Sequence, residues 1–587
     1  MNFLSYNISM RVLGIILLLN IFLTALPVKA FSANIPTTTL QIAREAEIRN
    51  TIASTPTSEV VRVGIGANSF KTWVYKNISI FGTSGIVLCD GDNAVKNIPA
   101  NTNINIKLEA DNSITVTQAD GTVILKPTST LRILCPTGLL GVKDLKRAGK
   151  QALYHGVFEI SKTKNGYFNL VNMIEVEEYL KGVVPNEMPV SFGLEALKAQ
   201  SVAARNYVLS PRVKASSNYD VVDSVASQVY YGANTEKALS NQAVKETEGL
   251  VATYDWNLIL AQYSSTAGGY TESYSNAFSD PATKEFPSKE KPYLKAKPDI
   301  LSQPPLNTEE AAAAYYKSRP DAYDIRSSYF RWQREWTADE LKKALQGTLA
   351  AQSATGFVKP AFNKGDVLDD IRELKVVRRG DSGKIMEMEV VTDSRTYKIY
   401  KELVVRRLIT KDGKALPSAN VVFDNIKDES GNLVSVKAYG GGFGHGVGMS
   451  QYGAGFMATE LHLPYDKILK HYYTGIAITT KPVTISNDKP ISTQHFYAAK
   501  NSAVIKIDNR LGVSNLSVNI NGRSQVFDLP RELMGYKRFA EIDISKYIKQ
   551  GENTIIFTSP EFAGSYVKKS LKLYVELVGK DDKSDIW

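Results

Sequence analysis

The stretch E-V-E-E-Y-L-K-G-V-V-P-N-E-M-P-V-S-F-G-L-E-A-L-K-A-Q-S-V-A-A-R-N-Y, residues 175–207, decides how the rest of the chain is interpreted. Its second half predicts a helix from about Ser191 to Ser210, with Ser191 as N-cap and Pro211 discouraging continuation. At helical spacing, one apolar stripe is formed by Leu194, Leu197, Ala204 and Val208. The stretch therefore predicts a strong helix directly after a proline-rich turn.

A glutamate, Glu187, stands between Pro185 and Pro189 just ahead of this helix. Proline fixes its own φ and restricts the residue before it, so we expect Glu187 on a stiff turn. Apolar neighbours such as Val184 and Met188 would desolvate the carboxylate and raise its pKa, as a general acid near neutral pH requires. A solvated turn glutamate without a chemical role is the alternative.

The N-terminus and the charge indicate an exported protein. The chain has 587 residues and a net charge of +10, which suggests three or four domains and polyanionic surroundings. Residues 1–30 are typical of an export signal, with Arg11, an apolar run and the small-x-small end Val28-Lys29-Ala30. The apolar run is shorter than the ~18–20 residues of a membrane span, which favours a cleaved signal over an uncleaved anchor. We expect a cell-wall or membrane surface as partner, not nucleic acid.

Several further blocks accompany the opening stretch in a fixed order. They are Ser227–Gly232 (S-Q-V-Y-Y-G), Tyr263–Glu272 (Y-S-S-T-A-G-G-Y-T-E), Pro292–Lys295 (P-Y-L-K), Gly444–Ala454 (G-H-G-V-G-M-S-Q-Y-G-A) and Ile468–Gly475 (I-L-K-H-Y-Y-T-G). From about Val60 to Ile478 the chain resembles the SpoIID/LytB family of sporulation stage II protein D and amidase enhancers. The resemblance implies a lytic transglycosylase acting on peptidoglycan strands stripped of stem peptides, with Glu187 as its catalytic residue.

A lytic transglycosylase needs one carboxylate where a glycoside hydrolase normally needs two. The 6-hydroxyl of muramic acid attacks its own anomeric carbon and forms a 1,6-anhydro ring, so no positioned water is required. A single Glu187 fits this chemistry. Asp220, Asp223 and Glu272 keep two-carboxylate hydrolysis open as an alternative. A non-enzymatic wall protein that stimulates an amidase is the other alternative, and a cell-wall amidase would then be a partner.

The remaining blocks offer groups suited to sugar binding. Neutral polar groups that suit sugar hydroxyls and amides are Gln200, Ser227, Gln228, Ser264, Ser265 and Gln451. Aromatic rings for sugar faces are Tyr230, Tyr263 and Tyr452, although each has the core as its alternative. The other candidate binding residues are Lys198, Arg205, Gly268, Gly269, Glu272 and His445. For Lys198, Gln200 and Arg205 a solvated helix face is the alternative. We expect His445 in the same cleft as Glu187, because flanking glycines let the backbone present the imidazole there. A structural histidine whose hydrogen bonds are satisfied within the protein is the alternative for His445.

The sequence argues against a metal or another cofactor. Some members of the resembled family hold zinc through Cys and His near the block that begins Y-S-S-T-A-G-G, but residues 261–278 contain neither residue type. The glycine-rich segment 440–448 lacks the G-K-[ST] of a phosphate loop. The only cysteines, Cys89 and Cys135, are too few for a structural zinc site. They form either a disulfide, which an exported chain permits, or two buried thiols in neighbouring strands.

The pattern along the chain predicts an α+β fold. It has a β-rich N-terminal region, a mixed α/β catalytic core with an inserted helical lid, and a C-terminal all-β sandwich. Within the insertion we expect a Trp-rich helix near Trp332–Gln346. The expected divisions are an export signal (1–30), a linker (31–58), the N-terminal β-rich part (59–150), the first half of the core (151–275), the insertion (276–365), the second half of the core (366–480) and the sandwich (485–580).

Overall fold

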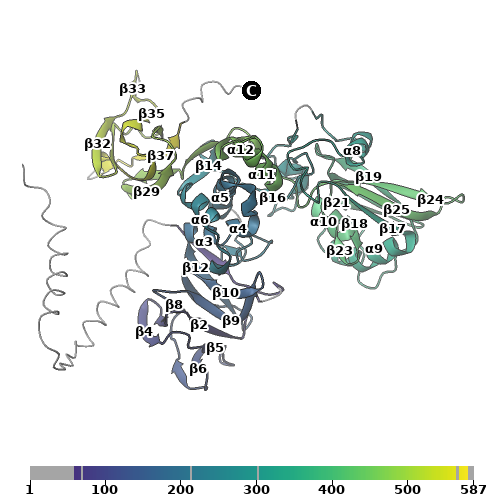
Figure 1. The fold of residues 1–587 in the computed structure, drawn as a ribbon, viewed down its shortest axis with the longest axis horizontal. Helices are drawn as coiled ribbons and strands as arrows, with labels where there is room; N and C mark the ends of the chain where they lie inside the picture. The colour runs from purple at the N-terminus through teal and green to yellow at the C-terminus, as the bar shows by residue number, and fades with distance from the viewer. Residues whose placement is uncertain are drawn as a thin grey trace, which may run out of the picture. The chain divides into compact units, whose positions relative to one another are not determined.

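The computed structural model describes residues 59–67, 70–211, 214–300, 303–533, 535–562 and 567–578 (Figure 1). The predicted export signal and linker, residues 1–58, lie outside the described residues. All described residues belong to one compact unit. Within these ranges, no helix has the length and apolar character needed to cross a membrane. Helices and many strands combine, which confirms the predicted α+β class.

Two sheets form the N-terminal part, as the alternating apolar residues predict. In β5, for example, Ile104, Ile106 and Leu108 are buried and the residues between them are not. The seven-stranded sheet has the order β13-β1-β12-β11-β8-β3-β4. Its strands are β1 (Val60–Gly64), β3 (Ile86–Asp90), β4 (Asn93–Ile98), β8 (Leu131–Leu134), β11 (Val157–Lys162), β12 (Phe168–Glu175) and β13 (Val221–Val222). The six-stranded sheet, in order, contains β10 (Lys150–Tyr154), β9 (Leu140–Arg147), β2 (Asn77–Gly82), β5 (Ile104–Leu108), β6 (Ile114–Gln118) and β7 (Val123–Leu125).

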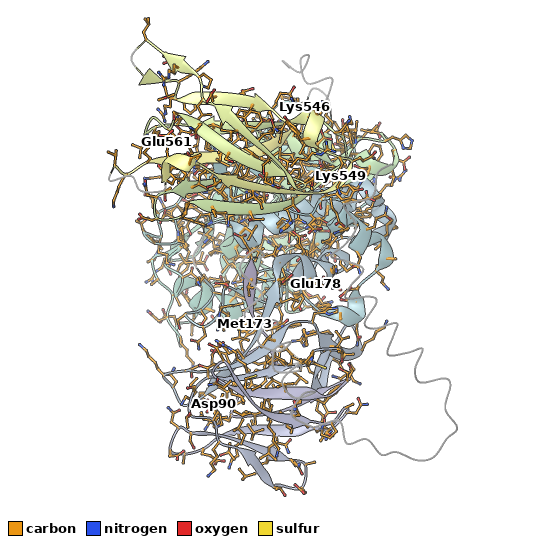
Figure 2. The ribbon with its side chains drawn as sticks, turned by 90° about the vertical axis from the view of Figure 1, so that its left-hand side faces the viewer. Asp90, Met173, Glu178, Lys546, Lys549 and Glu561 are labelled. Atoms are coloured by element: carbon orange, nitrogen blue, oxygen red, sulfur yellow. The ribbon has the colours of Figure 1, made fainter. Side chains whose placement is uncertain are left out.

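The strand β12 runs directly into the helical core, and Figure 2 labels Met173 on the strand and Glu178 on the helix that follows. The helix α5 is central there, since it packs against α3, α6, α11, α12 and β14. The core helices are α3 (Val176–Lys181), α4 (Val184–Glu187), α5 (Leu194–Leu209), α6 (Ala238–Lys245), α7 (Tyr274–Ala277), α11 (Gln451–Thr459) and α12 (Tyr465–Tyr472). Its short strands are β14 (Leu250–Tyr254), β15 (Asn257–Leu258), β16 (Tyr263–Ser264), β26 (Met449–Ser450) and β27 (Ala477–Thr480).

The ends of α5 show where the sequence rules applied. Ser210 is extended because it precedes Pro211, so the helix ends at Leu209 close to the predicted position. The predicted N-cap was wrong. Ser191 lies inside a 3₁₀ turn, and the N-cap is Gly193 with φ of 86°, a conformation that favours glycine.

The inserted region has a hydrophobic core of its own, and this core extends from Trp332 to Ala438. Residues on both sides of position 365 contribute to it, so the boundary expected there does not divide the packing. We call residues 303–442 the inserted lobe. It contains sheets as well as helices. Its elements are α8 (Glu309–Tyr316), β17 (Trp332–Thr337), α9 (Ala338–Ser353), β18 (Val358–Lys359), β19 (Ile371–Arg379), β20 (Ile385–Thr392), β21 (Thr396–Tyr400), α10 (Glu402–Leu408), β22 (Thr410–Lys411), β23 (Lys414–Ala415), β24 (Val421–Lys427) and β25 (Leu433–Gly440).

The C-terminal part contains two larger sheets and a two-stranded sheet, β33-β34, and one of the larger sheets continues into the core. Strand β37 pairs with β27, which pairs with β14, so the sheet order is β15-β14-β27-β37-β30-β35. The second sheet has the order β29-β36-β31-β32. The strands are β28 (Val483–Ser486), β29 (Ile491–Ala498), β30 (Ala503–Asp508), β31 (Asn515–Ile520), β32 (Arg523–Asp528), β33 (Arg531–Glu532), β34 (Gly535–Tyr536), β35 (Phe539–Asp543), β36 (Gly551–Thr558) and β37 (Ser570–Leu577).

Cys89 and Cys135 are both buried free thiols. Of the two alternatives, a disulfide or two buried thiols, the structure shows the second. Cys89 lies on β3 opposite Arg132 of β8, and burial raises the pKa of the Cys89 thiol to about 11. The Sγ of Cys135 lies 3.3 Å from the hydroxyl of Ser84.

Candidate active site

Glu187 is the last residue of α4, a single helical turn that begins at Val184 with Pro185 near its N-terminus. Met188 is extended, as expected for a residue before Pro189, and this ends the helix. The Met188 side chain is buried in the main core, which fixes the turn on the protein. The carboxyl group is therefore carried on a short, rigid segment.

The carboxyl group of Glu187 has a raised pKa. Burial raises it from the usual 4.5 to about 7, and two hydrogen bonds to the carboxylate oppose this shift. One comes from the backbone N–H of Val229, 2.6 Å from Oε1, and the other from the side chain of Gln451. No charged group of the described residues contributes to the shift. Glu187 is thus close to half protonated at neutral pH, which suits alternate acid and base roles.

Amide side chains and a tyrosine surround this carboxyl group. The Nε2 of Gln451 donates to Oε1 of Gln200 at 3.2 Å, and Nε2 of Gln200 has no partner among the described residues. The Nε2 of Gln228 donates to the Tyr263 hydroxyl at 2.9 Å. Burial, and next the Glu187 charge, raise the pKa of that hydroxyl. Four predicted binding residues therefore gather around Glu187.

The predicted serines lie beside this group, where two chain segments meet. Ser264 on β16 pairs with Ser450 on β26, and the Ser264 hydroxyl is buried without a hydrogen-bond partner among the described residues. The carbonyl of Ser265 accepts from the backbone N–H of Tyr452 at 3.0 Å. The Tyr452 ring packs edge-on against Phe192, with 4.9 Å between ring centres. These contacts connect the β16 segment to the start of α11.

The predicted glycines serve close packing with the inserted lobe. A Cβ on Gly268 would lie 2.7 Å from the backbone of Gly441, and one on Gly269 would lie 2.2 Å from the Tyr315 hydroxyl. Both glycines have positive φ, 78° and 92°. Positive φ and close contacts within the protein thus explain why both positions require glycine.

Two predicted cationic residues have their charges paired within the protein. The Nζ of Lys198 lies 2.8 Å from Glu195 and 2.7 Å from Glu246. The buried guanidinium of Arg205 binds Glu177 at 2.6 Å. Neither residue occupies the solvated face that was the alternative, because both are held by carboxylates.

Two residues of the S-Q-V-Y-Y-G block also have partners in the protein. Tyr230 is buried, donates to Asn172 at 2.8 Å, and packs against Tyr179 with 4.9 Å between ring centres. The hydroxyl of Ser227 accepts from the backbone N–H of Val222 at 3.1 Å. Tyr230 therefore occupies the core, which was the alternative to a sugar-binding role.

Glu272 is fully buried and connects the core to the inserted lobe. Its carboxylate accepts from Ser382 Oγ at 2.7 Å and from Asn276 at 2.9 Å, and its backbone N–H donates to the carbonyl of Gly446. Burial raises the pKa of Glu272, while the charge of the buried Lys384 opposes this shift. The carboxylate is thereby committed to structure.

The imidazole of His445 is held by the backbone on both sides. Its Nδ1 accepts from the N–H of Val447 at 3.0 Å, and the ring also hydrogen-bonds the backbone of Tyr263. Phe278 packs on it at 5.2 Å between ring centres. Burial, with the charge of Lys384 next, lowers the His445 pKa to about 3, so the ring is neutral. The bond to Tyr263 connects His445 to the residues around Glu187. That His445 and Glu187 share one cleft stays a prediction.

The other two candidate carboxylates also bind protein groups. Asp223 is buried against Arg147 at 2.6 Å and accepts from the indole N–H of Trp73 at 3.0 Å. Asp220 pairs with Lys214 at 2.8 Å. Each of the three candidates for a second catalytic carboxylate, Asp220, Asp223 and Glu272, thus binds a protein group other than Glu187.

Two groups near Glu187 were not predicted from the sequence. The backbone N–H of Val229 bonds Glu187, and no side-chain pattern predicts a backbone donor. Tyr231 is only half-buried, and the Glu187 charge is among the causes that raise its pKa. Period-two alternation in the S-Q-V-Y-Y-G block would have separated Tyr231 from the buried Tyr230.

A cavity of about 350 Å³ lies elsewhere, between the core helices and the C-terminal strands. Among its lining residues are Glu177, Lys245 and Gln494, and Glu187 is not one of them. We therefore do not assign this cavity to the candidate active site.

A buried glutamate with a raised pKa lies on a short turn before a central helix and is surrounded by amide side chains, and these residues form the candidate active site of this α+β protein. The Stage II sporulation protein family (SpoIID) matches residues 164–254, which contain Glu187, α5 and Gln228. This match and the relatives below confirm the predicted resemblance to the SpoIID/LytB family. Residues 280–448, which include the inserted lobe, match a domain of unknown function (DUF8618).

Curated relatives cover about half of the chain. It is 34% identical over 325 residues to the amidase enhancer of Bacillus subtilis (strain 168), and the match covers 51% of this chain but only 40% of that protein. It is 29% identical to stage II sporulation protein D of the same organism, covering 53% of this chain and 76% of the relative. For stage II sporulation protein D of Bacillus amyloliquefaciens the values are 28%, 53% and 75%.

Proposed function

We propose that the protein is an exported lytic transglycosylase that cleaves peptidoglycan glycan strands and uses Glu187 as its single acid and base. The observation that carries the proposal is the buried Glu187, whose pKa of about 7 lets one group serve both steps. The names of the relatives, an amidase enhancer and sporulation proteins, support a role at the cell wall.

The reaction requires one proton donor that later becomes an acceptor. Protonated Glu187 gives its proton to the glycosidic oxygen as the bond to the anomeric carbon breaks. The 6-hydroxyl of the same muramic acid attacks that carbon, and the carboxylate accepts the hydroxyl proton. The bonds from Val229 and Gln451 orient the carboxylate between the two steps.

The bonding of the other carboxylates favours this reaction over hydrolysis. A hydrolase would need a second carboxylate about 5–9.5 Å from Glu187 to act as nucleophile or to activate water. Asp223 and Glu272 are buried and bound to Arg147 and Ser382, respectively. Asp220 is paired with Lys214.

The second candidate function is a non-catalytic wall protein that stimulates an amidase. The observation in its favour is the 34% identity to a relative named amidase enhancer. Such a protein would need wall affinity and an amidase partner but no acid. Strand cleavage by the purified chain alone distinguishes the two functions.

The test is the substitution Glu187→Gln, assayed on strands stripped of stem peptides. The amide keeps the shape and cannot donate the proton, so we expect at least a ~10²-fold loss of rate. Glu178→Gln is the matched control, because Glu178 on α3 is partly exposed and paired with Lys181. Near-normal turnover by a folded Glu187→Gln protein would remove the assignment.

A further inference from the structure

Two aromatic rings next to the Glu187 segment are unused by the proposed chemistry. Phe70 and Tyr231 are stacked, with 6.2 Å between ring centres and 19° between ring planes, and neither ring is fully buried. Tyr231 comes two residues after Val229, and the backbone N–H of Val229 donates a hydrogen bond to Glu187. The Glu187 charge also affects the pKa of the Tyr231 hydroxyl, so the two groups are within electrostatic reach.

A buried ion pair fixes the position of Phe70. The guanidinium of Arg147 lies 4.2 Å from the centre of the Phe70 ring and 2.6 Å from the carboxylate of Asp223. The same carboxylate accepts from the backbone N–H of Gly66 and from the indole of Trp73, both at 3.0 Å. Gly66 and Trp73 lie on either side of Phe70 in the chain, so Asp223 binds described residues both before and after Phe70.

The energetics of this pair indicate a positioning role. The side chains of Arg147 and Asp223 are only 1% and 0% exposed. Burying two charges costs desolvation energy that their attraction roughly offsets, so such a pair adds little net stability. What the pair does achieve is to join the Phe70 loop of the N-terminal sheets to the segment that leads from Asp223 to Val229 and Tyr231.

We propose that the Phe70–Tyr231 stack is a sugar-binding subsite beside Glu187, and that the Arg147–Asp223 pair positions it. The proposal rests on the proposed function and adds where the glycan strand lies. Sugar ring faces carry C–H groups that pack on aromatic faces, and the Tyr231 hydroxyl can bond a sugar hydroxyl at the rim. Because Arg147 and Asp223 neutralise each other, the subsite suits the uncharged rings of the strand.

The test measures binding separately from cleavage. Full-length protein carrying Glu187→Gln is titrated with purified glycan strands stripped of stem peptides. Added Tyr231→Ala or Phe70→Ala should raise Kd about tenfold, since each removes a ring face, whereas Tyr231→Phe should stay within about threefold. The matched control is Phe539→Ala. Phe539 is 48% exposed on β35 of the C-terminal part and stacks on Trp256, so its loss removes a comparable ring that is stacked on a different partner.

The melting temperature of each variant shows that a loss of binding is not a loss of folding. Binding within twofold of the parent by folded Tyr231→Ala and Phe70→Ala proteins would overturn the subsite. If binding depends on Tyr231 but the unsubstituted protein, which retains Glu187, releases no cleaved strands, the subsite stands and the catalytic proposal fails. If Tyr231→Ala and Phe70→Ala, each made with Glu187 intact, cleave strands with unchanged KM, the catalytic proposal stands and the subsite fails.

Discussion

The protonation of Glu187 determines how the rate should depend on pH. Burial holds its pKa near 7, and the first step needs the protonated form. We therefore expect kcat/KM for glycan cleavage to fall about tenfold per pH unit above about 7. A pH–rate profile measures this. A rate that stays flat from pH 6 to 9 would contradict a role for Glu187 as the acid.

The same raised pKa predicts a stability effect of Glu187→Gln. Between pH 4.5 and about 7 the folded protein keeps a proton that the unfolded chain has released, so stability decreases as pH rises through this window. A glutamine has no charge to desolvate. We expect the variant to be more stable than the parent at pH 8, by up to about 3 kcal/mol, and equal to it near pH 4. Urea unfolding at both pH values tests this, and an equal difference at both would contradict it.

The sequence predicted the burial of the Glu187 carboxyl group but not all of its surroundings. Val184 and Met188 are buried, as the expected desolvation of Glu187 requires. The donors to its carboxylate come from Val229 and Gln451, which lie 42 residues or more along the chain and are brought in by tertiary packing. Local pattern carries no information about such contacts, so neither donor could be assigned to Glu187 from the sequence.

The loop between β19 and β20 connects the inserted lobe to the core through a buried polar network. Lys384 is fully buried, donates to Asn420, and lies within electrostatic reach of Glu272 and Glu402. Lys384→Met would leave the buried carboxylates without this charge, and we expect a loss of about 3–5 kcal/mol. Urea unfolding measures it.

A double-mutant cycle makes this prediction specific to the pair. Adding Glu272→Gln to Lys384→Met should cost less than the sum of the single changes, because the two groups interact. The matched control is Lys375→Met, since the Lys375 side chain is 57% exposed on β19 and should change stability little. Strict additivity of the two buried substitutions would show that the network does not couple them.

Two elements show why periodicity alone misassigned part of the lobe. Trp332 and Trp336 are both buried, and a spacing of four places residues on one face of either a helix or a strand. They lie on β17, and the helix starts only at Ala338, where Thr337 and Glu340 form a capping box. That capping pattern was readable in the sequence, whereas the strand is set by pairing with the distant β25.

Because the lobe has its own hydrophobic core, we expect the protein to unfold in more than one step. Trp336→Ala removes the largest buried side chain of the lobe, at a cost of about 3–5 kcal/mol. Differential scanning calorimetry should show one transition moving to lower temperature and another unchanged. Leu197→Ala in α5 should lower the temperature of the other transition and leave the transition of the lobe unchanged. A single transition that both variants shift equally would contradict separate unfolding.

The fold class was predictable from the sequence, but the limits of the inserted lobe were not. The α+β class and the strands at both ends follow from alternation of apolar residues. The lobe ends only near residue 440, because β25 returns to pair with β17 and β24 pairs with β25. Similarly, β37 joins the core sheet through β27, so the C-terminal part is less separate than its sequence pattern indicates.

The mass of the products from strands stripped of stem peptides tests the central claim most directly. Intramolecular attack by the muramic 6-hydroxyl leaves 1,6-anhydro ends, which are lighter than reducing ends by one water. The account predicts anhydro ends from the purified protein and none from Glu187→Gln. Reducing ends alone would mean hydrolysis with a second carboxylate, and would contradict a single-glutamate lytic transglycosylase.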